Sequence, residues 1–234
     1  MPPSANHSPW HPVPKKKSPK ETTSVPAAPA KNIKNVMGGS PLESVEGTPR
    51  GLFPHVISFC SSISSDSPFY LAVTAGREDV VRECVPNVHH WVERGGGKII
   101  FGWQIWEWYG VMIEAEFHAV WQDKENILHD VTPKDIACER ILFLPDQNLY
   151  YNEQQINNIK KPLILDQRVK DFIQISDSIF EFYNKGERAQ IHEEITITSE
   201  EALELQKIIA HRSELVLVVS NSIPGRNDFC RCGS

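Results

Sequence analysis

Three side chains in the middle of this sequence have types and an order that suit thiol chemistry. They are Cys84, His118 and Asp130. A histidine takes the proton of a cysteine thiol, an aspartate holds the imidazole in one tautomer, and the thiolate attacks an amide or ester carbonyl. The backbone N–H of Cys84 and the side chain of Gln104 are candidate donors to the resulting oxyanion. These residues predict amide or ester hydrolysis, or acyl transfer, and the sequence does not separate the two.

The residues around Cys84 predict that it lies at the start of a helix. Pro86 fits the first turn of a helix, and the apolar residues Val88, Trp91 and Val92 follow at helical spacing. Three glycines, at 95–97, are expected to end the helix. At a helix start, unpaired N–H groups and the helix dipole favour the thiolate, which is the reactive form of cysteine.

His118 and Asp130 fall on two predicted strands that a short polar turn joins. Residues 98–108 and 111–121 have the composition of strands, and residues 127–131 form a further strand after the turn at 122–126. Alternation puts His118 on the opposite face from its neighbour Phe117. An antiparallel hairpin of this kind predicts that the imidazole and the carboxylate lie side by side.

The order of these elements resembles the transglutaminase-like fold of the papain-like superfamily. The segments Phe117-His118-Ala119-Val120-Trp121 and Leu128-His129-Asp130-Val131-Thr132-Pro133 are similar to that family's histidine strand and aspartate strand. The resemblance spans residues 84–133 and implies that Cys84 is the nucleophile, His118 the base and Asp130 the orienting residue. The sequence departs from the family pattern in having Glu83 before the cysteine and Pro86 after it.

A second candidate site lies in the last ten residues, 225–234, which hold Cys230 and Cys232 behind a polar turn sequence. Two thiolates at this spacing bind one soft metal ion, but a closed structural zinc site has four ligands. The segment resembles the opening of the SEC-C motif, a small zinc-binding tail, with Phe229 and Arg231 where that family prefers proline. The resemblance implies zinc as the cofactor. Three alternatives stay open: truncation, completion by a remote residue or second molecule, or a tail that binds no metal.

Residues 103–146 also resemble an uncharacterised bacterial and phage protein family whose members sometimes carry a SEC-C tail. Two alternatives to the thiol enzyme remain. In the first, the chain is a non-catalytic protein that docks on a partner through its tail. In the second, Glu114, Glu116, His118 and His129 hold a metal, because carboxylate and imidazole sets bind Mn, Fe or Zn. A cysteine in a helix is also often a small buried apolar residue.

Composition and charge narrow the classes of function. Apolar residues make up 40% of the 234 residues, which is enough for a packed core, and no apolar run has the length of a membrane span. Residues 1–50 carry seven Lys/Arg and three Asp/Glu, so the remainder has a net charge of −10. An acidic body does not favour nucleic-acid binding. The N-terminus lacks a signal-peptide pattern, so we expect cytoplasmic residence, a protein partner for the tail and no membrane contact.

The fold class that these patterns predict is α+β, with an antiparallel sheet packed on the helix that bears Cys84. Residues 1–50, rich in Pro, Ser and Lys, are predicted to be disordered. The resemblances imply a transglutaminase-like core at residues 51–146 and a partial SEC-C motif at 223–234, with a helical extension at 147–222 between them. Within the extension, Thr198 and Glu201 predict a capping box at a helix start. Gly186 is expected to end the preceding helix.

Overall fold

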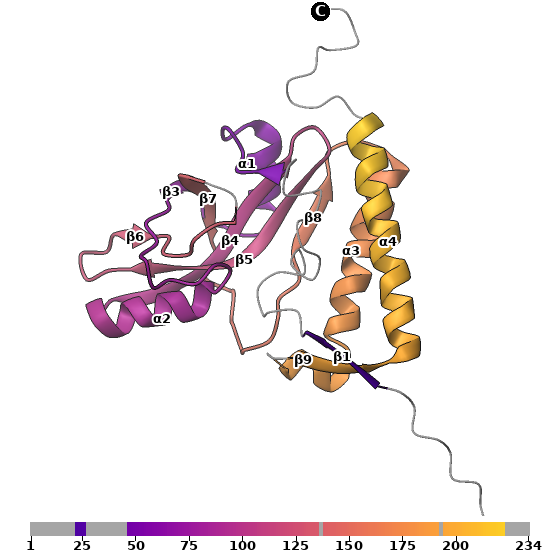
Figure 1. Ribbon diagram of the computed structural model, residues 1–234. Coiled ribbons are helices and arrows are strands. Elements are labelled where there is room, and N and C mark those ends of the chain that lie inside the picture. Colours follow the sequence, from indigo (N-terminus) through magenta and orange to yellow (C-terminus); the bar gives the residue numbers. More distant parts are fainter. Residues whose placement is uncertain (1–21, 27–45, 136–137, 192–193, 223–234) are drawn as a thin grey trace, which may run out of the picture.

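A computed structural model of the chain describes residues 22–26, 46–135, 138–191 and 194–222. The predicted α+β class is confirmed (Figure 1). In chain order the elements are β1 (Thr22–Pro26), β2 (Glu46–Gly47), α1 (Pro54–Ser61), β3 (Phe69–Ala72), α2 (Cys84–Gly95), β4 (Lys98–Trp108), β5 (Met112–Gln122), β6 (Leu128–His129), β7 (Arg140–Pro145), β8 (Ile159–Pro162), α3 (Gln167–Tyr183), β9 (Glu194–Thr198) and α4 (Ser199–Ser222).

The long β4–β5 hairpin is the centre of the fold. Its antiparallel register runs from the pair Lys98 and Gln122 to the pair Trp108 and Met112. The turn between the strands contains Gly110 at a φ of 71°, a backbone conformation that glycine adopts without strain. The predicted strand at 98–108 has the bounds of β4, and the strand predicted at 111–121 is displaced by one residue from β5.

The remaining strands curl the sheet. The strand order is β3-β7-β4-β5-β6, and a parallel bridge between Val73 and Asp130 brings the two outer strands together. The Thr74 N–H donates to the Asp130 carbonyl at 2.7 Å across this junction. We call the concave side the inner face; its apolar residues are Phe69, Leu71, Val73, Ile100, Val120, Leu128, Ile141 and Phe143.

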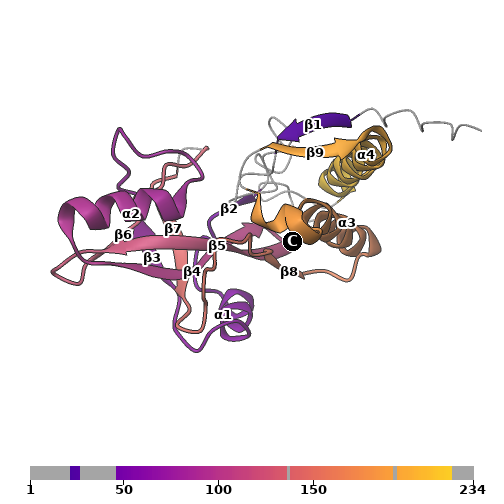
Figure 2. The same ribbon diagram turned by 90° about the horizontal axis from the view of Figure 1, so that it is seen from below.

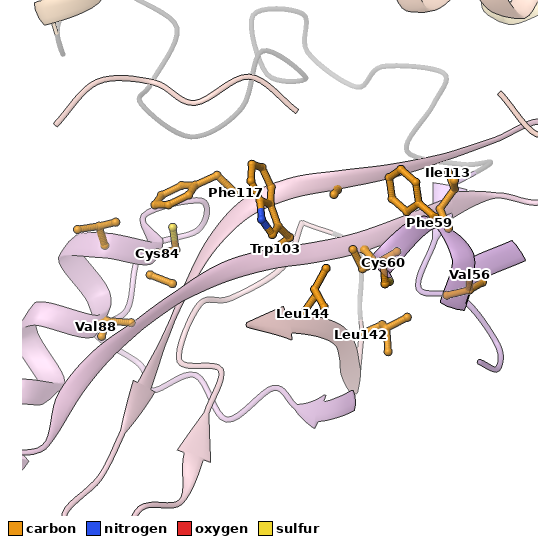
Figure 3. Close-up of a cluster of buried hydrophobic side chains, with 14 of the residues drawn as sticks. Val56, Phe59, Cys60, Cys84, Val88, Trp103, Ile113, Phe117, Leu142 and Leu144 are labelled. Atoms are coloured by element: carbon orange, nitrogen blue, oxygen red, sulfur yellow. The ribbon is translucent and has the colours of Figure 1, made fainter. Parts of the chain in front are cut away.

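The opposite, outer face packs against α1 and α2. Alternate residues of β4, β5 and β7 join the two helices in one apolar cluster that includes Val56, Phe59, Val85, Val88, Trp103, Phe117, Leu142 and Leu144 (Figure 3). The helix α2 lies so close to β5 that a Cβ on Gly95 would be 2.8 Å from the Trp121 ring. In Figure 2, α2 lies alongside β5.

The helices α3 and α4 pack side by side (Figures 1 and 2) and cover the turn end of the hairpin. Their shared cluster joins Trp108, Val111 and Met112 to Val169, Phe172, Leu215, Val216 and Val219. The predicted capping box is confirmed, since the Thr198 N–H donates to Glu201 and the Glu201 N–H donates to Thr198 Oγ1. Gly186 does not end α3, as the helix stops at Tyr183 and Gly186 begins a 3₁₀ turn instead.

Two features of the predicted organisation differ from the structure. The segment 147–222 is not purely helical, because it contains β8 and β9. Leu149 and Tyr151 also pack against the outer-face cluster, so this segment continues the core rather than following it. Most of residues 1–50 lies outside the described residues, and Thr22–Pro26 pair antiparallel with β9. Within the described ranges, none of the helices has the length and apolar character that crossing a membrane requires.

Candidate functional site

His118 and Asp130 meet on the inner face of the curled sheet. The distance from His118 Nε2 to Asp130 Oδ1 is 3.0 Å. His118 is 5% exposed and Asp130 is fully buried. β5 supplies the histidine, and Asp130 comes directly after β6, which pairs with β5. The predicted hairpin therefore brings these two side chains into contact.

Lys134 completes a buried polar cluster that the sequence did not indicate. Its Nζ lies 2.7 Å from Asp130 Oδ2, donates to Gln104 Oε1 at 3.1 Å and lies 3.5 Å from His118 Nε2. The chain returns over the site because the Thr132 N–H donates to Asp130 Oδ1 at 3.1 Å, as in an Asx turn. That turn, in the sequence Asp130-Val131-Thr132-Pro133-Lys134, is the one signal that places Lys134 here.

The charges of this cluster are set by burial and by Lys134. Burial lowers the pKa of His118, the Lys134 charge lowers it further, and Asp130 only partly opposes them. Burial would raise the pKa of Asp130, but the contacts with His118 and Lys134 outweigh it and lower that pKa to about 2. At neutral pH the cluster is therefore an Asp130–Lys134 ion pair beside an uncharged imidazole.

Two more polar atoms border the cluster. Among the described residues, Gln104 Nε2 and Thr132 Oγ1 have no hydrogen-bond partner, although both are buried. A buried donor without a partner costs about 1–3 kcal/mol, so the hydrogen bonding at this end of the inner face is incomplete. The Oε1 atom of Gln104 accepts from Lys134, whereas Cys84 belongs to the outer-face cluster, and the suggested oxyanion role of the Gln104 side chain stays a prediction.

Cys84 lies on the other side of the sheet. It begins α2, as predicted, but its side chain is 4% exposed and belongs to the outer-face cluster with Phe117 (Figure 3). His118, the next residue along β5, faces inward and lies against the Phe143 ring at 6.3 Å between centroids. Successive strand residues point to opposite faces, so β5 itself separates the thiol from the imidazole.

The structure thus brings His118 and Asp130 of the predicted triad together. It places Cys84 in the cluster on the opposite face of β5. The reason is the apolar stripe of α2, which packs on the outer face through Val85 and Val88. Order along the chain does not reveal which face of a strand a preceding helix will cover.

Aromatic side chains surround Cys84. Tyr151 stacks on Phe117 with 5.2 Å between ring centroids, and Phe101 stacks on the same ring at 5.8 Å. Burial raises the pKa of Tyr151, and nearby acidic groups, among them the Cys84 thiol, raise it further. This surrounding is that of a packed side chain, since a thiolate nucleophile requires access and Cys84 is 4% exposed.

The alternative metal site is not assembled either. Glu116 accepts from Trp106 Nε1 at 2.6 Å, Glu114 accepts from Asn158, and His129 contacts Asp123 at 2.9 Å on the outer face. In the described part of the chain, no three His, Cys, Asp or Glu side chains are grouped so that they could hold a metal ion. The second predicted site, Cys230 and Cys232, lies outside the described residues.

A surface groove of about 430 Å³ lies between β8 and α3, lined in part by Lys170, Asp177 and Glu181. None of the candidate residues lines it. In comparisons with known proteins, no family model, no curated protein and no solved structure matches the chain. The resemblances to the transglutaminase-like and SEC-C families therefore stay predictions.

Proposed function

We propose that this chain is a binding protein rather than a thiol enzyme, with the curled sheet as a rigid scaffold and residues 223–234 as a metal-dependent docking tail. The observation that carries the proposal is the separation of Cys84 from His118 by β5. A nucleophile and its base must lie within hydrogen-bonding reach of each other. In this fold the base is buried against an ion pair, and the thiol is buried in an apolar cluster.

The buried cluster on the inner face suits a structural role. An ion pair taken out of water stabilises little by itself, but removing one partner is costly because it leaves a buried charge. The contacts of the cluster converge on the Asp130 carboxylate. It accepts hydrogen bonds from His118 and from the Thr132 N–H, and it forms an ion pair with Lys134. These contacts fix the segment after β6 across the inner face and hold the sheet in its curled form.

The tail supplies the proposed binding chemistry. Cys230 and Cys232 offer two thiolates to zinc, and a closed tetrahedral site needs two further ligands. Residues beyond position 234, a partner protein, a second copy of the chain or a remote residue would supply them. Zinc binding then couples the tail to whichever molecule completes the site, and this makes the tail a docking element for a protein partner.

Zinc retention by the purified full chain tests this proposal. After dialysis against zinc-free buffer, zinc is released by denaturation and measured with the chromogenic chelator 4-(2-pyridylazo)resorcinol. We expect the parent and a Cys84→Ser control to retain zinc, and a Cys230→Ser/Cys232→Ser variant to lose it. One zinc for every two chains would identify a second copy as the source of the missing ligands. Equal zinc in all three proteins, or none in the parent, would contradict the proposal.

A second assay addresses the enzyme alternative directly. The release of p-nitrophenol from p-nitrophenyl acetate reports a reactive thiol whatever the natural substrate is. We expect the parent and Cys84→Ser to release it at the same rate. A rate that falls at least ten-fold in Cys84→Ser would return the chain to thiol-dependent acyl chemistry.

A further inference from the structure

The strand β9 is anchored to the helices independently of its strand partner. Its alternate residues Ile195 and Ile197 are each 1% exposed and pack with Ile179, Tyr183 and Leu205. The strand leads directly into α4, because Thr198 forms the capping box of that helix. β9 therefore has both a fixed position and a high content of β-branched residues, which favour strands.

The strand that occupies the edge of β9 has a different character. β1 has the sequence Thr-Thr-Ser-Val-Pro and comes from a segment far away in the chain (Figure 1). It pairs over five residues, with Thr23 opposite Ile197 and Val25 opposite Ile195. Only one of the five residues is a large aliphatic one, and the last is proline. The antiparallel ladder itself is made of main-chain hydrogen bonds, which do not discriminate between sequences.

We propose that the edge of β9 is a strand-addition site for an extended peptide segment of another protein, and that residues 22–26 are its built-in occupant. A segment with large aliphatic residues opposite Ile195 and Ile197 offers more apolar surface there than the sequence of β1, which has valine and threonine at these positions. Burial of additional apolar surface stabilises the pairing. Such a segment displaces β1 and forms the same antiparallel ladder with β9.

The covalent connection of β1 to the rest of the chain determines which segment can replace it at the edge of β9. Residues 27–45 link β1 covalently to β2, and a covalent link makes the binding of the attached segment intramolecular, which raises its effective concentration. The β1 segment of a second copy makes the same contacts without the tether, so it loses the competition at ordinary protein concentrations. The occupant that replaces β1 must offer better side chains, and this identifies it as a segment of another protein.

Two adjacent proline substitutions in the full chain test the inference. In an antiparallel ladder, successive residues direct their N–H groups alternately toward the partner strand and away from it. Because proline has no N–H, one of Ser24→Pro and Val25→Pro removes a ladder bond and the other serves as its matched control. The probe is a fluorescein-labelled synthetic peptide of residues 20–28 that carries Thr23→Ile and Val25→Ile.

We expect one proline variant to bind the peptide at least ten-fold more tightly than the parent does, and the other to bind like the parent. A full-length Thr23→Ile chain strengthens the built-in strand and should bind the peptide more weakly than the parent. Equal peptide binding by all four proteins, or binding by none, would overturn the proposal. A parent that is dimeric by light scattering and becomes monomeric in one proline variant would also overturn it, in favour of strand exchange between copies. Neither result depends on the zinc tail.

Discussion

Removing the Lys134 ammonium group should destabilise the fold by an amount that depends on pH. In the structure Lys134 Nζ lies 2.7 Å from Asp130 Oδ2, and the lysine side chain is 9% exposed. In Lys134→Met the fully buried Asp130 carboxylate keeps only the neutral His118 and one backbone N–H as partners. Removing one member of a buried ion pair costs about 3–5 kcal/mol. A loss of that size is a large part of the roughly 5–15 kcal/mol by which a domain is stable.

The pH dependence follows from His118. In the parent, burial and Lys134 lower the pKa of His118 below its value in the unfolded chain. The unfolded chain then binds more protons in mildly acidic solution, so the parent loses stability as the pH falls below about 6.5. In Lys134→Met the contribution of Lys134 is gone and the carboxylate has no cation, so the pKa of His118 rises. Because the pKa of His118 is less depressed in the variant than in the parent, the variant loses less stability as the pH falls, and the difference between the two proteins shrinks in acid.

Urea unfolding followed by tryptophan fluorescence measures both effects. At about pH 8 we expect Lys134→Met to lie roughly 3–5 kcal/mol below the parent, and at about pH 5.5 the difference should be clearly smaller. Lys170→Met, at an exposed position of α3, is the matched control and should change stability little at either pH. A loss below about 1 kcal/mol at pH 8, or the same loss at both pH values, would refute the ion-pair account.

Two further substitutions test the local structure. Thr198→Ala removes the side-chain half of the capping box and should cost about 1 kcal/mol in urea unfolding, whereas Thr196→Ala, at an exposed position of β9, should cost less; equal losses would mean that the cap contributes nothing. Gly97→Ala should destabilise far more than Gly110→Ala, because both have positive φ but only at Gly97 would a Cβ lie 2.0 Å from a backbone oxygen, that of Gln122. Similar thermal unfolding temperatures for the two would show that the close approach is absent.

The sequence was sufficient for the elements with strong local signals. The β4–β5 hairpin has long apolar and aromatic strands around a tight turn. The capping box of α4 is a pattern of four residues that depends on nothing outside itself. The contact of His118 with Asp130 also followed, because a short hairpin connection leaves little choice of register.

Features that depend on long-range packing could not be read in this way. Both faces of β5 are buried, so the alternation of its residues does not show which face α2 covers. From the sequence, Lys134 has the pattern of an exposed lysine. In the structure the turn at Asp130 directs its side chain to the inner face. The short strands β3, β8 and β9 have sequences that also fit loops or helices, and they become strands because β7, β5 and β1 pair with them.

The environment of each cysteine sets the expectation for chemical labelling. Cys84 is buried among aromatic residues, Cys138 is partly exposed, and burial raises the pKa of Cys60 to about 11. Alkylation requires both access and a thiolate. Cys84 and Cys60 should therefore react slowly in the native protein, and Cys138 faster.

Peptide-resolved alkylation with iodoacetamide between pH 5 and 9, in the parent and in His118→Ala, tests the central claim most directly. Rates in denaturant give the reference for each peptide, and unfolding curves establish that both proteins are folded during labelling. The account predicts that Cys84 reacts more slowly than Cys138, with the same pH profile in both proteins. A Cys84 that reacts fastest at low pH and loses this advantage in His118→Ala would demonstrate a thiolate–imidazolium pair and contradict the separation of the two side chains by β5.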